Sequence, residues 1–392
     1  MLDDELWAEL LNNELGHVDA ISSVSYELGS QPEDAQARLQ VAVLRKLKGL
    51  RRLAITGVIE TTPVGINVLK DASPLPRIIS RSLSHFTSLE SLAFFQLDFD
   101  GDQDSTSWLP PNLKSLELNL CSGEGDLFKQ TSGSTWDLAI PVKELSIRNI
   151  LHGRGSVEQG LLPLCLKAAA TCCTDACIDC PLLLPPMPQP VDFLQIPTEA
   201  LVTRKLRLVG LVAAFQGVDH PSLLRIVDML STFNRGSLSW LSLPVYDVFR
   251  VHPILHNLSM PSLVTLVLHN NPPFYLRNPA RSSKDLYRHD VHLTLTSLLS
   301  ASFPSLSTLS LIGFFDVTGV LELAFSTSKD LASHYMEFSA LLAFLRWTQV
   351  VELRLKDTVR RAVTGECVFE RKDVDAADWT PRFVKETVYT FR

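Results

Sequence analysis

The sequence predicts an α/β solenoid, in which a curved parallel sheet forms the inner layer and helices and irregular loops form the outer layer. The prediction starts from one phrase, in which Leu263, Leu266 and Leu268 follow the spacing L-x-x-L-x-L and Asn271 stands three residues further on. The residues between these leucines alternate with them, as in a short strand with one buried and one exposed side. The phrase recurs along the chain, which is typical of folds built by stacking similar units.

This spacing is that of the leucine-rich repeat, in which each unit supplies one strand and then a helix or an irregular segment. Residues 21–55 predict one complete unit, because a strand pattern at 21–26 is followed by a capping box at Ser30 and Glu33, helical spacing at 39–47 and a second strand at 50–55. Further phrases lie at residues 89–94, 113–118, 142–147, 203–208, 238–243, 263–268, 306–311 and 350–355. We therefore expect the repeats to run over residues 17–358.

The remaining segments complete the expected organisation. Residues 1–16 have a leucine face at helical spacing, so we expect a helix that caps the first repeat. Residues 359–392 are β-prone, and we expect a hairpin that covers the edge of the last strand. A Cys- and Pro-rich stretch at about 151–202 interrupts the phrases, and it predicts either an inserted loop or a repeat hidden by an atypical sequence. A further helix is expected at 326–347.

The composition limits the class of protein. Hydrophobic residues make up 46% of the 392 residues and the net charge is −7, which suits a continuous core and disfavours a nucleic-acid partner. The sequence begins without the basic and apolar segments of a secretory signal, and no apolar run reaches the roughly 18 residues that span a membrane. The seven cysteines do not form the pattern of a small disulfide-rich domain. We expect a cytoplasmic or nuclear protein with no membrane contact.

Residues 260–271 and 303–311 resemble the repeat bodies of fungal F-box/LRR-type proteins, and the irregular repeat lengths are similar too. The likeness covers residues 17–358. It implies a leucine-rich-repeat fold and a substrate-recognition subunit of a cullin-type ubiquitin ligase, in which an F-box before the repeats docks the ligase adaptor. This sequence departs from the family because no F-box precedes the repeats. The family's Asn or Cys after each phrase is present as Cys121 and Asn271, whose side chains are expected to bond turn backbone.

One group of side chains suggests metal chemistry. Cys172, Cys173, Cys177 and Cys180 lie within nine residues, and in a helix the last three would share one face. Zinc favours four sulfur or nitrogen ligands, but its sites usually combine two ligand clusters that are distant in sequence. The alternative is that these cysteines act as small apolar side chains, and we expect no cofactor.

The sequence contains no complete catalytic motif. The histidines at 252 and 256 have Pro253 where a metalloprotease helix has glutamate, and those at 289 and 292 lie in a polar loop, so we interpret both pairs as structural. No phosphate-binding loop or nucleophile elbow is visible, although catalytic groups can also be brought together only in space.

Strand residues that alternate with the buried leucines must point to the opposite face of the sheet, which is the expected concave, partner-binding surface. Trp and Arg are frequent anchors in such interfaces. The set is Arg52, Phe95, Glu117, Arg148, Lys205, Arg207, Trp240, His269, Arg354 and Lys356. The expected function is a non-catalytic protein–protein interaction scaffold, whose partner is another protein. The alternatives are the ligase subunit, with the cullin ligase adaptor as partner, and an enzyme or zinc protein that uses the cysteines.

Overall fold

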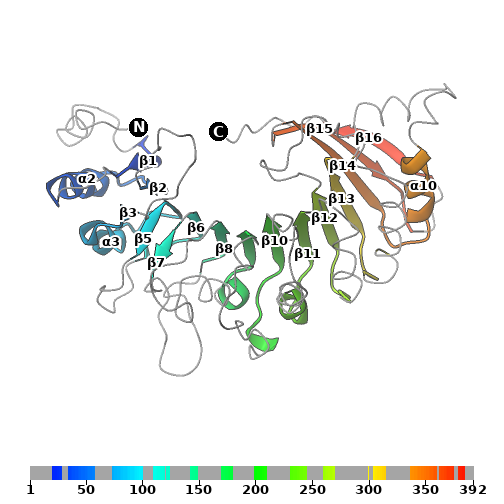
Figure 1. Ribbon diagram of the computed structural model, residues 1–392, viewed down its shortest axis with the longest axis horizontal. Helices are drawn as coiled ribbons and strands as arrows, with labels where there is room; N and C mark the ends of the chain where they lie inside the picture. Colours follow the sequence, from blue (N-terminus) through cyan, green and yellow to red (C-terminus); the bar gives the residue numbers. More distant parts are fainter. Residues whose placement is uncertain are drawn as a thin grey trace, which may run out of the picture. The chain divides into compact units, whose positions relative to one another are not determined.

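The computed structural model shows two compact units, each built around a sheet of mainly parallel strands (Figure 1). Unit 1 comprises Met1–Ile178 and Pro185–Thr203, and unit 2 comprises Asp179–Leu184 and Arg204–Arg392. The structure describes residues 20–28, 34–57, 73–99, 109–119, 121–123, 142–148, 169–179, 198–209, 230–244, 259–269, 299, 303–314, 336–359, 362–374 and 378–384. The expected helix at 1–16, the capping box and the Pro-rich segment lie outside these residues.

The main sheet of unit 1 has the strand order β1-β2-β4-β6-β8-β9, and all neighbours are parallel. The strands are β1 (Ser23–Glu27), β2 (Arg52–Thr56), β4 (Ser91–Phe95), β6 (Ser115–Asn119), β8 (Glu144–Arg148) and β9 (Asp175–Asp179). Each strand pairs with the one from the next repeat, so equivalent positions of the phrase lie side by side across the sheet. This strand order and register are those of a leucine-rich repeat solenoid, which confirms the predicted fold class.

Burial along the strands of unit 1 follows the predicted alternation. In β6 the leucines Leu116 and Leu118 are fully buried, whereas Ser115, Glu117 and Asn119 are half-buried. The row Leu53–Leu92–Leu116–Leu145 therefore forms one line of the core. Burying a side chain of this size stabilises the fold by about 1.5–3 kcal/mol. The opposite positions form a second face of the sheet, which we call the open face.

Helices and a small sheet complete unit 1. Helix α2 (Asp34–Lys46) buries Ala37, Val41 and Leu44 at helical spacing and contacts α3 (Arg77–Leu83). A second parallel sheet contains β3 (Ser73–Pro74), β5 (Leu97–Phe99) and β7 (Ser122–Gly123). Gln96, with a φ of 54°, turns the chain from β4 into β5. Cys121 donates its thiol to the carbonyl oxygen of Phe94 in β4 at 3.4 Å, and Asn271, the other residue of this kind, lies outside the described residues.

The stretch that lacks a recognisable phrase contains a further repeat strand, β9. Cys173, Ala176 and Ile178 occupy the three leucine positions and are buried, while β9 pairs in parallel with β8. Thr203 replaces the first leucine of the next repeat, and its buried hydroxyl donates to the carbonyl oxygen of Ala169 at 2.7 Å. Hence the repeat persists where small or polar side chains replace leucine. Thr198–Ala200 form a short 3₁₀ helix before this position.

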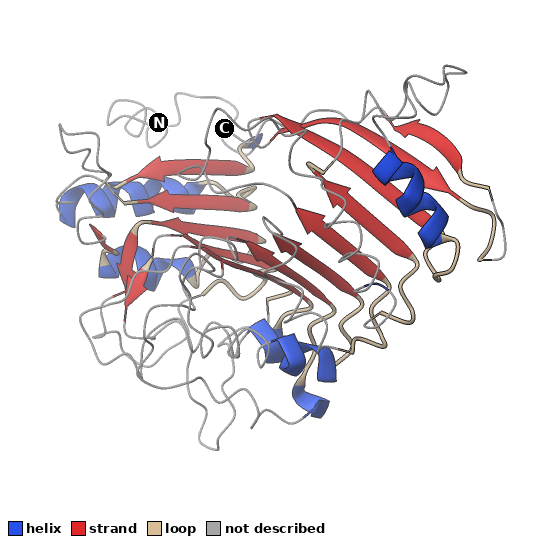
Figure 2. Ribbon diagram, turned by 45° about the vertical axis from the view of Figure 1, so that its right-hand side comes forward, coloured by secondary structure: helices blue, strands red, loops and turns tan. Residues whose placement is uncertain are grey.

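Unit 2 contains the strands β10 to β16, which lie side by side in Figure 2. They are β10 (Lys205–Val209), β11 (Trp240–Pro244), β12 (Thr265–His269), β13 (Thr308–Ile312), β14 (Glu352–Val359), β15 (Ala362–Glu370) and β16 (Thr380–Val384). β10 to β14 are parallel, whereas β15 and β16 are antiparallel. The C-terminal hairpin thus begins with β15 at Ala362.

One face of the terminal strands in unit 2 is covered by α10 (Met336–Leu345). Phe338 of this helix contacts Phe369 of β15, with 5.1 Å between the ring centroids, and Leu341 and Leu345 are fully buried. Phe369 lies opposite Leu353 in the register, so the helix packs on the leucine side. The expected helix at 326–347 is described only from 336 onward. Within the described residues, no helix is both long and apolar enough to cross a membrane.

Candidate interaction surface

The ten residues predicted for the partner-binding surface occur in both units. In unit 1, the Arg52 side chain is exposed, whereas Phe95, Glu117 and Arg148 are half-buried. The structure brings Glu117 and Arg148 together, with 3.8 Å between Arg148 Nε and Glu117 Oε1. Arg148 Nε also donates to Ser146 Oγ at 3.2 Å. Exposed ion pairs of this kind contribute little stability, about 0–1 kcal/mol, so this pair chiefly balances charge on the open face of unit 1.

In unit 2, the other six predicted residues occupy three rows of the open face. The register places Lys205 beside Trp240, and Arg207 beside Ser242. His269, Ile312 and Lys356 form the row at the strand ends. Val267 and Ser310 fill the row between, and both are buried even though they point to the open face. The alternation in the sequence predicts that this whole face is exposed to solvent. In the structure, the centre of the face is a buried apolar floor of Val267 and Ile312, and longer polar side chains surround this floor.

His269 has an environment that keeps its ring neutral. Its Nε2 lies 2.6 Å from Ser242 Oγ. Burial, together with the positive charges of Arg207 and Lys356, lowers the pKa of His269 to about 4. These two cations come from β10 and β14 and flank the ring, which lies on β12 between them. The field around His269 is therefore positive.

The Ser242–His269 pair does not form a catalytic triad among the described residues. Ser242 is fully buried, and no carboxylate of the described chain contacts the His269 ring. A serine nucleophile needs both access to substrate and an oriented base. The pair therefore acts as a polar contact that fixes the ring between two strands.

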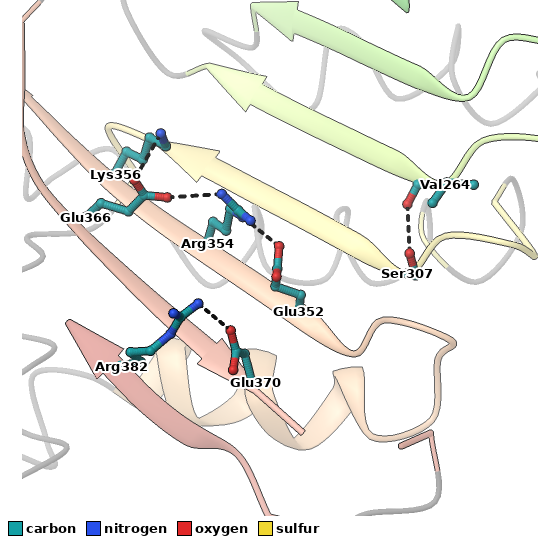
Figure 3. A network of polar contacts seen from close by, with 8 residues as sticks. All are labelled: Val264, Ser307, Glu352, Arg354, Lys356, Glu366, Glu370 and Arg382. Carbon is teal, nitrogen blue, oxygen red and sulfur yellow. Dashed lines mark hydrogen bonds and ion pairs between the residues drawn. The ribbon is translucent and has the colours of Figure 1, made fainter. Parts of the chain in front are cut away.

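A charge network extends from β14 to β16 (Figure 3). Glu366 on β15 is only 2% exposed and lies 3.1 Å from Lys356 Nζ, measured from Oε2, and 3.6 Å from Arg354 Nη1, measured from Oε1. Arg354 Nε donates to Glu352 Oε1 at 2.6 Å. Farther along, Arg382 Nη2 donates to Glu370 Oε1 at 2.7 Å. A buried carboxylate is costly unless charge compensates it, so Glu366 depends on the two cations and in turn fixes their positions.

Sequence reasoning missed Glu366, Glu352 and Ser242, although these side chains position three of the predicted residues. In the sequence, Glu366, Val368 and Glu370 alternate along one strand and therefore share one face. This pattern identifies Glu366 as a partner of Lys356 only once the antiparallel register places the two residues opposite each other. The predicted set also omits Trp347, which follows α10 and is 88% exposed. It belongs to no strand, so the alternation could not identify it.

The structure separates the cysteines that were considered as zinc ligands. Residues 175–179 form a strand, so the helical face shared by Cys173, Cys177 and Cys180 does not exist. Cys173 lies in the core, where burial raises the pKa of its thiol, whereas Cys177 is half-buried on the open face. Cys172 ends a helical segment, and Cys180 lies outside the described residues. Within the described chain, no three His, Cys, Asp or Glu side chains are grouped as metal ligands.

Comparison with known proteins finds similarity among solved structures. No protein-family model and no curated protein matches the sequence. Among solved structures, the chain is similar to the leucine-rich repeat-containing protein LegL7 from Legionella pneumophila, with 14% identity and a TM-score of 0.41, over 89% of this chain and 88% of that chain. The fold assignment rests on the strand order, register and burial described above.

Proposed function

We propose that the protein is a non-catalytic interaction scaffold and that the open face of unit 2 contacts its protein partner. The observation that carries this proposal is the register of β10 to β14, which places Trp240, His269 and several cations on one face while the leucines fill the other. Trp and Arg are enriched among residues that dominate binding energy, and a rigid sheet holds them at low entropic cost. The open face of unit 1 is a weaker candidate because its central row contains small side chains, such as Ser25, Ala54 and Ala93.

The test is affinity purification of the tagged protein from its own cells, followed by mass spectrometry. We expect one protein to be enriched with the wild type and at least tenfold depleted with Trp240→Ala, since truncation of an anchor residue commonly costs about 2 kcal/mol or more. Phe95→Ala is the matched control, because it removes an aromatic side chain from the open face of unit 1. Equal recovery with both variants, each with a wild-type circular dichroism spectrum, would contradict the proposal.

A second candidate function is the substrate-recognition subunit of a cullin-type ubiquitin ligase. It is supported by the resemblance of the repeat phrases to fungal F-box/LRR-type proteins. The same purification distinguishes it, because a ligase subunit would recover the cullin adaptor in near-equal amount, and Trp240→Ala would remove only the substrate. An adaptor found at background level would leave the scaffold function alone.

A further inference from the structure

We propose that the open face of unit 2 binds an acidic segment of the partner, with carboxylates placed between Arg207 and Lys356. The inference rests on the proposed function and names the chemistry of the partner.

The charge distribution across this face is asymmetric. At the described open-face positions of β10 to β13, the charged side chains are Lys205 and Arg207, and none is acidic. Arg207 is exposed and forms no ion pair with any residue that the structure describes. The acidic groups begin at β14, where Glu352 and Glu366 already neutralise much of the charge of Arg354 and Lys356. Among the described residues, Arg207 is therefore an exposed cation with no acidic side chain beside it on this face, on a chain whose net charge is −7.

The buried carboxylate of Glu366 prepares one end of this surface. Its Oε2 lies 3.1 Å from Lys356 Nζ, and the Lys356 side chain is 19% exposed, so this side chain is held in place while part of it still reaches solvent. A cation held by a buried carboxylate loses little further entropy when it contacts a ligand. At the other end, Arg207 supplies a planar guanidinium that matches a carboxylate in geometry.

The distance between the two ends sets the length of the ligand. Neighbouring strands lie about 4.8 Å apart, so four steps from β10 to β14 span about 19 Å. An extended peptide rises about 3.3 Å per residue, which makes a segment of about six residues long enough. Val267 and Ile312 lie between the cations and are 8% and 9% exposed, so the middle of the segment meets an apolar floor. Trp240, which pairs with Lys205, borders the same region.

A protein segment fits this surface better than a nucleic acid does. A polyanion of regular charge would meet Glu352 and Glu370 beyond the cations, and it would be repelled by the overall negative charge. Exposed charges interact over about 8–10 Å at ordinary salt concentrations, so a short acidic segment responds mainly to the local positive field.

The experiment measures binding of fluorescein-labelled hexaglutamate to the full chain by fluorescence anisotropy at low salt. We expect saturable binding that weakens with added salt, two- to fivefold weaker binding for Arg207→Gln, and a greater loss for Arg207→Glu. Arg38→Gln is the matched control, because it removes an exposed arginine from helix α2, which carries none of the predicted partner-binding residues. Hexalysine should not bind this surface, and a hexathymidylate strand should bind more weakly than hexaglutamate.

Three results would overturn the inference: no hexaglutamate binding at millimolar concentration, equal loss with Arg207→Gln and Arg38→Gln, or tighter binding of hexathymidylate. The proposed function fails separately. If the purified partner is lost with Trp240→Ala while hexaglutamate does not bind, the scaffold function stands and only the acidic partner is wrong. If hexaglutamate binds but no protein depends on Trp240, the proposed function fails instead.

Discussion

The low pKa of His269 gives unit 2 a stability that depends on pH in the acidic range. Between pH 6.5 and about 4, the unfolded chain binds a proton at this histidine and the folded protein does not. Stability therefore decreases as the pH falls through this range, and it is unaffected by His269 above it. The groups that oppose protonation are Arg207 from β10 and Lys356 from β14, together with burial, while Glu366 on β15 is already paired with Lys356.

The magnitude follows from the two pKa values. A decrease from 6.5 to about 4 corresponds to about 3 kcal/mol once both states are protonated, and about 2 kcal/mol of this loss is reached at pH 5. Replacing His269 by Gln removes the titration and keeps a polar group near Ser242. We expect the free energy of unfolding of the wild type to fall between pH 7.5 and pH 5 by about 2 kcal/mol more than that of His269→Gln.

The assay is urea denaturation of both proteins at the two pH values, followed by tryptophan fluorescence. Other groups titrate equally in both proteins, so the difference between wild type and variant isolates His269. His85→Gln is the control, because it makes the same replacement at an exposed histidine of unit 1. An equal loss of stability in the wild type and His269→Gln would refute the low pKa and the positive field inferred around this ring.

Two further predictions concern the core contacts of each unit. Arg371 is 5% exposed and donates to the carbonyl oxygens of Val350, Arg346 and Val374. In urea denaturation, Arg371→Leu should therefore lower the free energy of unfolding by about 2–4 kcal/mol. Lys372 is exposed, so Lys372→Leu should change it by less than about 0.5 kcal/mol, and similar losses in the two variants would contradict the role of Arg371. In unit 1, Cys173 is buried in a core position, whereas Cys177 lies on the open face. Iodoacetamide should therefore label Cys177 in the folded protein, and it should label Cys173 only after denaturation. Peptide mass spectrometry measures this order, and rapid labelling of Cys173 would show that residues 173–178 do not form a repeat.

Much of the fold could be predicted because the leucine phrase fixes both the strand and its buried face. Leu53, Leu92 and Leu116 each identify a repeat without knowledge of their neighbours, since two apolar residues separated by one residue must share a face of a strand. The prediction failed to locate β9 because Cys173 and Ala176 replace leucine there. Both are small apolar residues that bury well but give no repeat signal in the sequence.

The open-face residues were predictable one strand at a time, but their environment was not. Alternation alone identifies His269 as pointing away from the leucines. Its neutral state also depends on Arg207, which is 62 residues earlier in the chain (269 − 207), and on Lys356, which is 87 residues later (356 − 269). Only the register between repeats brings these three side chains together. Pairwise contacts of this kind are a property of stacking, so a single repeat cannot reveal them.

The C-terminal hairpin shows how edge protection and surface chemistry can be combined in one element. An unpaired β14 would present its backbone donors and acceptors to other chains, and β15 removes that edge by antiparallel pairing. The same pairing brings Glu366 beneath Lys356 and Arg354, where it fixes the two cations. Because β15 runs antiparallel, a shift of its register by one residue would turn Glu366 into the leucine core and Cys367 onto the open face. The cost of an unpaired carboxylate in that core opposes the shift, so the charge network also specifies the register of the strand that closes the sheet.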